Sequence, residues 1–372
     1  MPEPRVIDLV AAARPNFMKV APVLRAMEAS GCGLAARIVH TGQHYDEGMS
    51  AVFFRDLGIR EPDVHLGVGS GTHGTQTGRV LAAYEEHLLS ASPPPAATVV
   101  VGDVNSTMAC ALAAVKLEIP VAHVEAGLRS FDRSMPEEIN RLVTDAVAEL
   151  LLVSEPAGEE NLRKEGIADG RIVYVGNVMI DTLMAELPAA KALGAPRSHG
   201  LDEGAYAYVT LHRPSNVDEP GRLGEVLGLL EAIASRLPVV FPVHPRTKGR
   251  LEEAGLWERA LGASGLRLLE PLSYREALGL MAGARFVLTD SGGIQEETSV
   301  LGIPCLTLRP NTERPVTVSQ GTNTVVGEDT SRALALVEEI LAGRYKTGQP
   351  IAGWDGRAAE RVVAALVERY GG

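Results

Sequence analysis

Short apolar runs alternate with longer amphipathic stretches along most of this chain. Runs that predict β-strands occur in the first half at residues 6–11, 37–41, 98–101, 121–124 and 150–153. The stretch after the first run repeats apolar residues at Val20, Val23, Leu24 and Met27, the spacing of a helix with one face against a sheet. This alternation is typical of parallel sheets with helical connections and predicts an α/β fold.

The pattern pauses and then starts again in the second half. A helical pattern at 178–191 leads into 195–204, whose glycines, prolines and charges predict a linker. Further strands are predicted at residues 206–211, 239–243, 266–269, 286–289 and 305–308. Because 372 residues exceed what one core usually supports, we expect two doubly wound domains. The last segment, 354–370, has helical spacing and is compatible with either domain.

The chain has 35 basic and 47 acidic residues, a net charge of −12. Nucleic acids and anionic membranes bind basic surfaces, so neither is an expected partner. An anionic substrate therefore requires a local basic pocket.

The three cysteines, Cys32, Cys110 and Cys305, are scattered and lack the spacing of metal ligands. We expect reduced core thiols, without a disulfide or a bound metal. The first apolar run contains Asp8 and is followed at once by Arg14, unlike a signal peptide, and no later run approaches the length of a membrane span. We expect a cytoplasmic protein.

The segment TDSGGIQEE, residues 289–297, predicts a strand that passes through a glycine turn into a helix. The turn at Ser291, Gly292 and Gly293 lets the backbone approach a ligand, and the helix N-terminus offers N–H groups and a partial positive charge to a phosphate. Glu297, one turn later, is placed to accept hydrogen bonds from ribose hydroxyls. An ordinary strand-to-helix turn is the alternative. The spacing differs from a dinucleotide fingerprint, so we expect no cofactor.

The segment AARPNFMK places Arg14 and Lys19 just after the first strand, where α/β sheets bind ligands. Two cations at the start of a helix oppose its dipole unless an anion lies between them, which favours a phosphate role over a solvated surface pair. The glycine-rich segment at 67–74 follows no clear strand, and we expect a flexible loop there.

Three acids follow strands or begin a helix: Asp103, Glu125 and Glu137. An acid directly after an apolar strand needs a partner if it is buried, so its recurrence indicates a site. Glu138 is interpreted as an ordinary residue of a helix start, because Pro136 and acids are favourable there.

Two predicted strands of the second half end in histidine, at His212 and His244. A single histidine in such a place is more often structural, but two at one sheet edge indicate a site. Arg309 and Arg314 follow another strand near the same edge, where arginine suits a diphosphate.

In order, the chain contains the motifs ARPNFMK, GDVNST, HVEAGLR, PEEINR, LHR, PVH, DSGGIQEE and TERP. In this order they resemble the non-hydrolysing UDP-N-acetylglucosamine 2-epimerases, and the resemblance spans residues 6–322. It implies two Rossmann-like domains in the GT-B architecture, with the active site in the interdomain cleft. The N-terminal domain would comprise residues 1–176 plus a returning helix at 354–372, and the UDP-binding domain residues 177–353.

The resemblance also implies the reaction: UDP leaves by anti elimination, and the enzyme-bound 2-acetamidoglucal takes UDP back after a proton reaches the other face of C2. No cofactor takes part, and the family is commonly dimeric, so we expect a homodimer. The catalytic residues implied are Asp103, Glu125, Glu137 and His212. The substrate-binding residues implied are Arg14, Lys19, Arg141, Ser291, Gly292, Gly293, Glu297 and Arg314. A second substrate molecule activates bacterial members through positions that match Gln43, Arg79 and His244.

The chain departs from the family in two motifs, of which one, His-Arg-Xaa-Glu-Asn, is here His-Arg-Pro-Ser-Asn at 212–216. Gly-Thr-Arg-Pro-Glu is here Ala-Ala-Arg-Pro-Asn at 12–16, a version found in relatives that act on UDP-2,3-diacetamido-glucuronate, which is therefore a second possible substrate. A further glutamine of the activator site is Asp46 here.

Three functions compete with a non-hydrolysing epimerase: a hydrolysing epimerase, a GT-B glycosyltransferase and an inactive nucleotide-sugar sensor. Arg14 and Lys19 favour the non-hydrolysing branch of the family. Beyond the shared architecture, no feature of the sequence requires the acceptor site of a glycosyltransferase. The complete set of acids speaks against a sensor.

Overall fold

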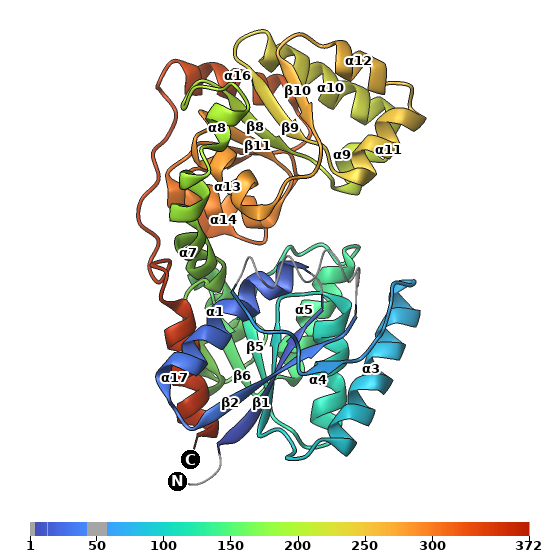
Figure 1. The fold of residues 1–372 in the computed structure, drawn as a ribbon, viewed down its shortest axis with the longest axis vertical. Helices are drawn as coiled ribbons and strands as arrows, with labels where there is room; N and C mark the ends of the chain where they lie inside the picture. The colour runs from blue at the N-terminus through green and yellow to red at the C-terminus, as the bar shows by residue number, and fades with distance from the viewer. Residues whose placement is uncertain (1–3, 13, 43–57, 372) are drawn as a thin grey trace. The chain divides into compact units, whose positions relative to one another are not determined.

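The computed structural model describes residues 4–12, 14–42 and 58–371. The chain divides into two compact units, which we call unit 1 (Met1–Thr182 with Ala352–Gly372) and unit 2 (Leu183–Ile351) (Figure 1). The chain passes from one to the other inside helix α7 (Val178–Ala192). The segment 195–204, expected as a linker, instead lies within unit 2. There it begins with the short helix α8 (Ala195–Ser198), and the Gly204 N–H donates to the Gly283 carbonyl at 2.8 Å.

Unit 1 contains a seven-stranded parallel sheet in the order β3-β2-β1-β4-β5-β6-β7. Its strands are β1 (Arg5–Ala11), β2 (Leu34–His40), β3 (Val64–His65), β4 (Ala97–Val101), β5 (Val121–Ala126), β6 (Leu150–Val153) and β7 (Ile172–Tyr174). The succession of strands reverses direction between β1 and β4, which pair in parallel with Leu9 opposite Val99. This is the strand arrangement of a doubly wound fold.

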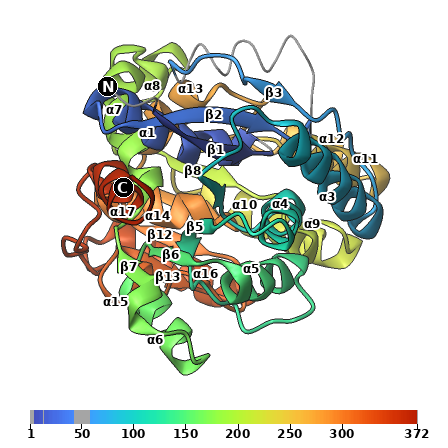
Figure 2. The same cartoon turned by 90° about the horizontal axis from the view of Figure 1, so that it is seen from below.

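Helices cover both faces of this sheet. They are α1 (Arg14–Ser30), α3 (His73–Ser90), α4 (Asn105–Lys116), α5 (Pro136–Val147), α6 (Pro156–Lys164), α7 and α17 (Ala358–Tyr370). Figures 1 and 2 show α1 and α17 on one face and α3, α4 and α5 on the other. The helix α1 buries Val20, Val23, Leu24 and Met27, the apolar stripe seen in the sequence.

Unit 2 contains a six-stranded parallel sheet in the order β10-β9-β8-β11-β12-β13. Its strands are β8 (Ala207–Thr210), β9 (Val239–Pro242), β10 (Leu266–Leu269), β11 (Phe286–Thr289), β12 (Cys305–Thr307) and β13 (Asn323–Val325). Its further helices are α9 (Pro214–Val217), α10 (Pro220–Ala234), α11 (Pro245–Glu253), α12 (Trp257–Gly262), α13 (Tyr274–Ala282), α14 (Gly292–Leu301), α15 (Pro315–Ser319) and α16 (Thr330–Leu341). The two Rossmann-like domains expected from the sequence are thus confirmed.

No apolar run in the sequence predicted the strands β3, β7 and β13. Each has only two or three residues and lies at an edge of its sheet, so the apolar run that marks a buried strand is short or absent. Two of the three free cysteines, Cys110 and Cys305, are buried as expected, whereas Cys32 is partly exposed.

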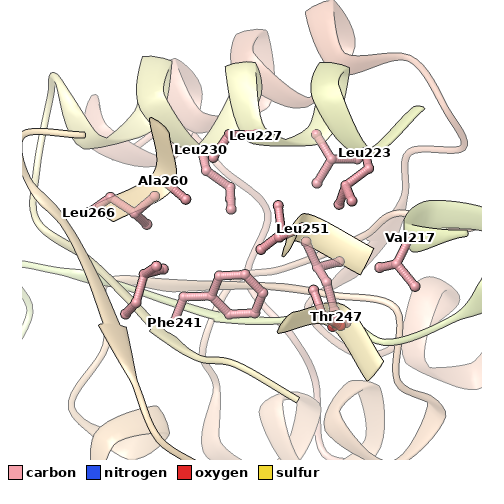
Figure 3. A pocket seen from close by; sticks show the side chains of 12 residues that line it. Val217, Leu223, Leu227, Leu230, Phe241, Thr247, Leu251, Ala260 and Leu266 are labelled. Carbon is pink, nitrogen blue, oxygen red and sulfur yellow. The ribbon is translucent and has the colours of Figure 1, made fainter. Parts of the chain in front are cut away.

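An apolar pocket lies in the core of unit 2, between the sheet and the helices α10, α11 and α12 (Figure 3). Its lining residues are Leu211, Val217, Leu223, Val226, Leu227, Leu230, Phe241, Thr247, Leu251, Ala260, Leu266 and Leu268. The hydroxyl in this lining, that of Thr247, donates to the Leu211 carbonyl at 2.6 Å. The pocket therefore offers apolar surface only, which does not suit a sugar or a phosphate.

The C-terminal helix α17 is fastened to unit 1. Both carboxylate oxygens of Asp181 accept hydrogen bonds from its first turn, at 3.0 Å from the Ala358 N–H and 2.7 Å from the Ala359 N–H. The indole of Trp354 donates to the Ser154 carbonyl at 2.8 Å. Among the described helices, including α17, none is both long and apolar enough to cross a membrane.

We predict that Asp181→Ala loosens α17, because two N–H groups at the helix start lose their acceptor. A lost N-terminal cap is worth about 1–2 kcal/mol, so amide hydrogen exchange in α17, followed by mass spectrometry, should accelerate about 5- to 30-fold. Glu368→Ala changes an exposed carboxylate of the same helix and serves as the control. Equal exchange in the two variants would contradict the capping role.

Candidate active site

The site residues expected from the sequence follow the strands at the two reversals of strand order. In unit 1, Lys19 lies in α1 after β1, Asp103 follows β4, and Glu125 is near the end of β5. In unit 2, His212 follows β8 and Ser291 follows β11. The carboxyl ends of strands at such a reversal are where doubly wound sheets bind their ligands.

Glu125 has a strained backbone at a bulge. The register of β5 against β6 shifts between Val124 and Ala126, and Glu125 between them has φ of +72°. A non-glycine residue in this left-handed region is uncommon, and such strain and such bulges gather near functional sites. The side chain is only 8% exposed, and its Oε2 accepts a hydrogen bond from the Lys19 ammonium. The bulge thus directs a buried carboxylate toward a cation of α1.

Gly102 lies between β4 and Asp103, next to Lys19 and Glu125. Its φ is +69°, and a Cβ there would lie 3.1 Å from the Lys19 Nζ and 3.3 Å from the Glu125 Oε2. The positive φ and the small space for a side chain both favour glycine at this position. The close approach brings Asp103, the next residue, into the neighbourhood of Lys19 and Glu125.

Asp103 is itself paired with a buried arginine. Its Oδ2 accepts from Nη1 of Arg141, whose Nη2 donates to the Glu138 Oε2 at 2.7 Å. Asp103 keeps 32% of its side chain exposed, whereas Arg141 is nearly inaccessible. Arg141, expected to bind substrate, therefore contacts one of the expected catalytic acids in the protein itself.

Glu138 does more than the helix-start role expected from the sequence. It is buried and accepts hydrogen bonds from the backbone N–H groups of Ser130 and Phe131, both at 3.0 Å, besides those of Arg141. Burial alone would raise the pKa of Glu138, but these donors lower it below its usual value. Arg141 three residues later on the same helix was the available sequence signal.

The remaining residues expected in the first half are placed as follows. Glu137 lies in the first turn of α5 and is partly exposed. Arg14 is the first residue of α1, and its side chain is outside the described part of the structure. Arg79 is exposed on α3. Gln43 and Asp46, two positions of the expected activator site, lie outside the described residues.

In unit 2, the turn predicted from TDSGGIQEE begins the helix α14. Ser291 is its N-cap residue, and Gly292 and Gly293 form its first turn. A Cβ at Gly292 would lie 2.7 Å from Nη1 of Arg314, so glycine lets the guanidinium rest against the helix start. Backbone N–H groups and an arginine at one helix N-terminus make an anion-binding arrangement.

Buried carboxylates hold the arginines beside this turn. Nε of Arg314 donates to the Glu296 Oε1, and Arg309 makes a two-bonded pair with Glu313 at 3.0 and 2.6 Å. Burial would raise the pKa of Glu313, but the bonds from Arg309 and the charge of Arg314 lower it to about 2. Neither Glu296 nor Glu313 was expected from the sequence. Arg314 lies 18 residues after Glu296, so only the fold brings that pair together, whereas Arg309 and Glu313 are four residues apart.

The carboxylate of Asp290 binds the backbone just after β8, where His212 lies. This buried carboxylate accepts from the backbone N–H groups of His212 and Arg213, at 3.0 and 2.9 Å, and lies 3.2 Å from the His212 Nδ1. The His212 and His244 rings are 5.5 Å apart, which confirms that these two strand ends are neighbours. Burial, and then the charge of His212, lower the pKa of His244.

Glu297 has a different environment from the other carboxylates. It is 3% exposed, and its Oε1 accepts from the Tyr274 hydroxyl at 2.7 Å. Burial raises its pKa to about 7, and the charge of Glu296 adds to the increase, while the Tyr274 hydrogen bond opposes it. A carboxyl group that lacks a cation in this way is suited to accept hydrogen bonds from neutral hydroxyls. Tyr274 was not expected from the sequence.

Together these groups provide two chemical capabilities. Unit 2 offers an anion-binding helix start, an imidazole and a carboxyl group for hydroxyls. Unit 1 offers two carboxylates, each beside a cation, which suit proton transfer.

Comparisons with known proteins agree with this chemistry. A family model described as UDP-N-acetylglucosamine 2-epimerase matches residues 25–367. A UDP-N-acetylglucosamine 2-epimerase of Methanocaldococcus jannaschii is 41% identical over 366 residues, 97% of this chain and 98% of that protein. A UDP-2,3-diacetamido-2,3-dideoxy-D-glucuronate 2-epimerase of Pseudomonas aeruginosa is 40% identical over 367 residues, 96% of this chain and 98% of that protein. A crystal structure of the M. jannaschii enzyme in complex with UDP-GlcNAc and UDP superposes with a TM-score of 0.88 and 39% identity, covering 98% of this chain and 99% of the other.

We predict that Glu297→Gln stabilises the protein without nucleotide increasingly as the pH rises from about 4.5 to about 7. The pKa of Glu297 is raised from 4.5 to about 7 in the folded state, so its stabilising proton is present at low pH and is lost as the pH rises through about 7. The amide of the variant keeps the size and never ionises. The gain in free energy of unfolding should approach about 3 kcal/mol at pH 8.5 and fall below about 1 kcal/mol at pH 5.

Urea unfolding at the two pH values measures this gain. Glu252→Gln, an exposed carboxylate of the same unit, is the control and should change stability at neither pH. A gain that is the same at pH 5 and pH 8.5 would show that Glu297 does not titrate near neutrality.

Proposed function

This chain belongs to the UDP-N-acetylglucosamine 2-epimerase family, and we propose that it interconverts UDP-N-acetylglucosamine and UDP-N-acetylmannosamine by inverting C2 of the sugar. The observation that carries this proposal is the pair of carboxylates at the ends of β4 and β5. Asp103 and Glu125 lie beside Arg141 and Lys19, and Gly102 holds them near each other. Two carboxyl groups are what an inversion by proton removal and proton delivery requires.

The proposed reaction begins with elimination. A carboxylate takes the proton from C2, the C–H electron pair forms a C1–C2 double bond, and the bond from C1 to the phosphate oxygen breaks. No carbonyl group acidifies the C2 hydrogen, so stabilising the departing diphosphate is the main means of lowering the barrier. The start of α14 and Arg314 supply that stabilisation, and Glu297 receives the ribose hydroxyls.

The second half of the reaction restores the substrate skeleton. A carboxylic acid delivers a proton to the opposite face of C2 in the enzyme-bound 2-acetamidoglucal, and a UDP oxygen adds to C1. Asp103, Glu125 and Glu137 are the proposed proton-transfer residues, and His212 is proposed to act at the diphosphate. Lys19 and Arg141 hold the carboxylates that they touch in position for proton transfer.

UDP-2,3-diacetamido-glucuronate is the second candidate substrate. The Ala-Arg-Pro form of the first motif and the identity to the Pseudomonas relative favour it. The chemistry at C1 and C2 would be the same, because the two sugars differ at C3 and C6. The turnover of each substrate, compared at equal concentration, decides between them.

We predict that turnover of UDP-N-acetylglucosamine in deuterium oxide places deuterium at C2 of both the product and the recovered substrate. Elimination gives the original hydrogen to a carboxyl group that exchanges with solvent, and a group on the other face returns a solvent-derived one. NMR and mass spectrometry of the sugar nucleotides measure the label.

Three results would each contradict part of the proposal. Epimerised product without deuterium would exclude the elimination route. Free N-acetylmannosamine as the first product would indicate a hydrolysing epimerase. Turnover of the diacetamido-glucuronate alone would leave the proposed mechanism unchanged and identify that sugar nucleotide as the substrate.

We predict that Asp103→Asn and Glu125→Gln each lower turnover at least about a hundredfold, the usual scale for general acid–base groups. Both changes keep the shape and remove the charge. The affinity for UDP, measured by calorimetry, should change far less than turnover, because the start of α14, Arg314 and Glu297 keep their proposed contacts. Asp169→Asn and Glu149→Gln alter exposed carboxylates of unit 1 and are the matched controls. Near-normal turnover in both variants would refute the assignment.

A further inference from the structure

His123 is a buried residue of β5 that the proposed mechanism does not use. It is fully inaccessible and precedes Glu125 by two residues. Its Nδ1 is 2.6 Å from Oδ1 of Asp145 on α5, and its Nε2 is 2.8 Å from the carbonyl oxygen of Gly102. The imidazole thus connects α5 to the turn that precedes Asp103.

Both partners of His123 are hydrogen-bond acceptors. A neutral imidazole can donate from only one of its nitrogens, whereas an imidazolium donates from both. Asp145 is ionised, because the charges of His123 and Arg129 lower its pKa although burial would raise it. The geometry therefore calls for a donor on each ring nitrogen of His123.

The carboxylate of Asp145 has further partners inside the protein. Asp145 also contacts Nη1 of Arg129 at 2.7 Å and the Gly127 N–H at 3.0 Å. Arg129 in turn makes a two-bonded pair with Glu165 at 2.8 and 2.6 Å. Asp145 and Arg129 are thus buried as an ion pair, while Glu165 extends to the surface.

The hydrogen bond from His123 completes a two-point attachment of Gly102. The Gly102 N–H donates to the Val124 carbonyl at 3.1 Å, and the Gly102 carbonyl accepts from His123. His123 and Val124 are the two residues directly before Glu125, and Gly102 is directly before Asp103. The two bonds therefore hold the peptide that leads into Asp103 in a set position relative to Glu125.

We propose that His123 is a positioning residue for the epimerisation, and that its Nε2–H aligns Asp103 with Glu125 by holding the carbonyl of Gly102. This inference rests on the proposed function. In this proposal His123, the histidine of HVEAGLR, does not contact the substrate. A misplacement of about 1 Å at a proton-transfer group can reduce the rate about a hundredfold, so such a contact is kinetically important.

Two variants separate the two bonds of His123. The side-chain amide of Gln extends to the place of Nε2, so His123→Gln keeps a donor for Gly102 and loses the one for Asp145. The shorter amide of Asn lies at the place of Nδ1, so His123→Asn keeps the bond to Asp145 and loses that to Gly102. Both remove the imidazole ring, which makes them matched controls for its loss.

We expect His123→Asn to lower kcat, measured as deuterium entry at C2, about 10- to 100-fold. KM and the affinity for UDP should change less than about twofold, and His123→Gln should retain most of the activity. A similar loss in both variants, a loss that follows the melting temperatures, or no loss in His123→Asn would overturn the proposal and leave His123 a structural residue.

Crystal structures of both variants test the positioning directly. The Gly102–Asp103 peptide should be displaced in His123→Asn and unmoved in His123→Gln, and the opposite result would refute the inference. This comparison does not depend on activity. If the unmodified protein fails to epimerise either sugar nucleotide, the proposed function is wrong, and the structures still decide whether His123 sets the position of Asp103.

Discussion

The reversal of strand order in each parallel sheet determines where the chemistry of this protein lies. The succession of strands changes direction between β1 and β4 and again between β8 and β11. Connections that leave the two strands of a reversal run to opposite faces of the sheet, which opens a crevice at their carboxyl ends. Lys19, Asp103 and Glu125 in unit 1 and Ser291 in unit 2 follow these strands or their neighbours, although they are far apart in the sequence.

Burial then requires each charge at these strand ends to have a partner. A buried ion without a counter-charge is very unfavourable, so Lys19 is found with Glu125, and Arg141 with Asp103 and Glu138. These pairs limit the orientations of the carboxylates before a substrate arrives. The strained backbone of Glu125 has the same origin, since the surrounding contacts maintain a conformation that the residue alone would avoid.

The charged groups of unit 2 have in part other kinds of partner than those of unit 1. Arg314 is held by Glu296, and Glu297 beside it has a tyrosine hydroxyl in place of a cation. Its raised pKa follows from that environment. The anion-binding helix start and this carboxyl group are separate features of one helix, α14.

The period of the apolar residues by itself determined the α/β class and ten of the thirteen strands in the described residues, because that period reflects which face of each element is buried. The family motifs identified the chemistry at the strand ends. The sequence could not show which polar residues support that chemistry. Glu138, Arg141 and Asp145 occur at helical spacing on α5, but the pattern alone does not tell a buried polar face from a solvated one. Only the tertiary structure, which places α5 against the turn after β4, decided that Arg141 binds Asp103 and that Asp145 holds His123. Such contacts join residues that no local rule connects, and they exist because buried charges and hydrogen-bonding groups must find partners wherever the fold supplies them.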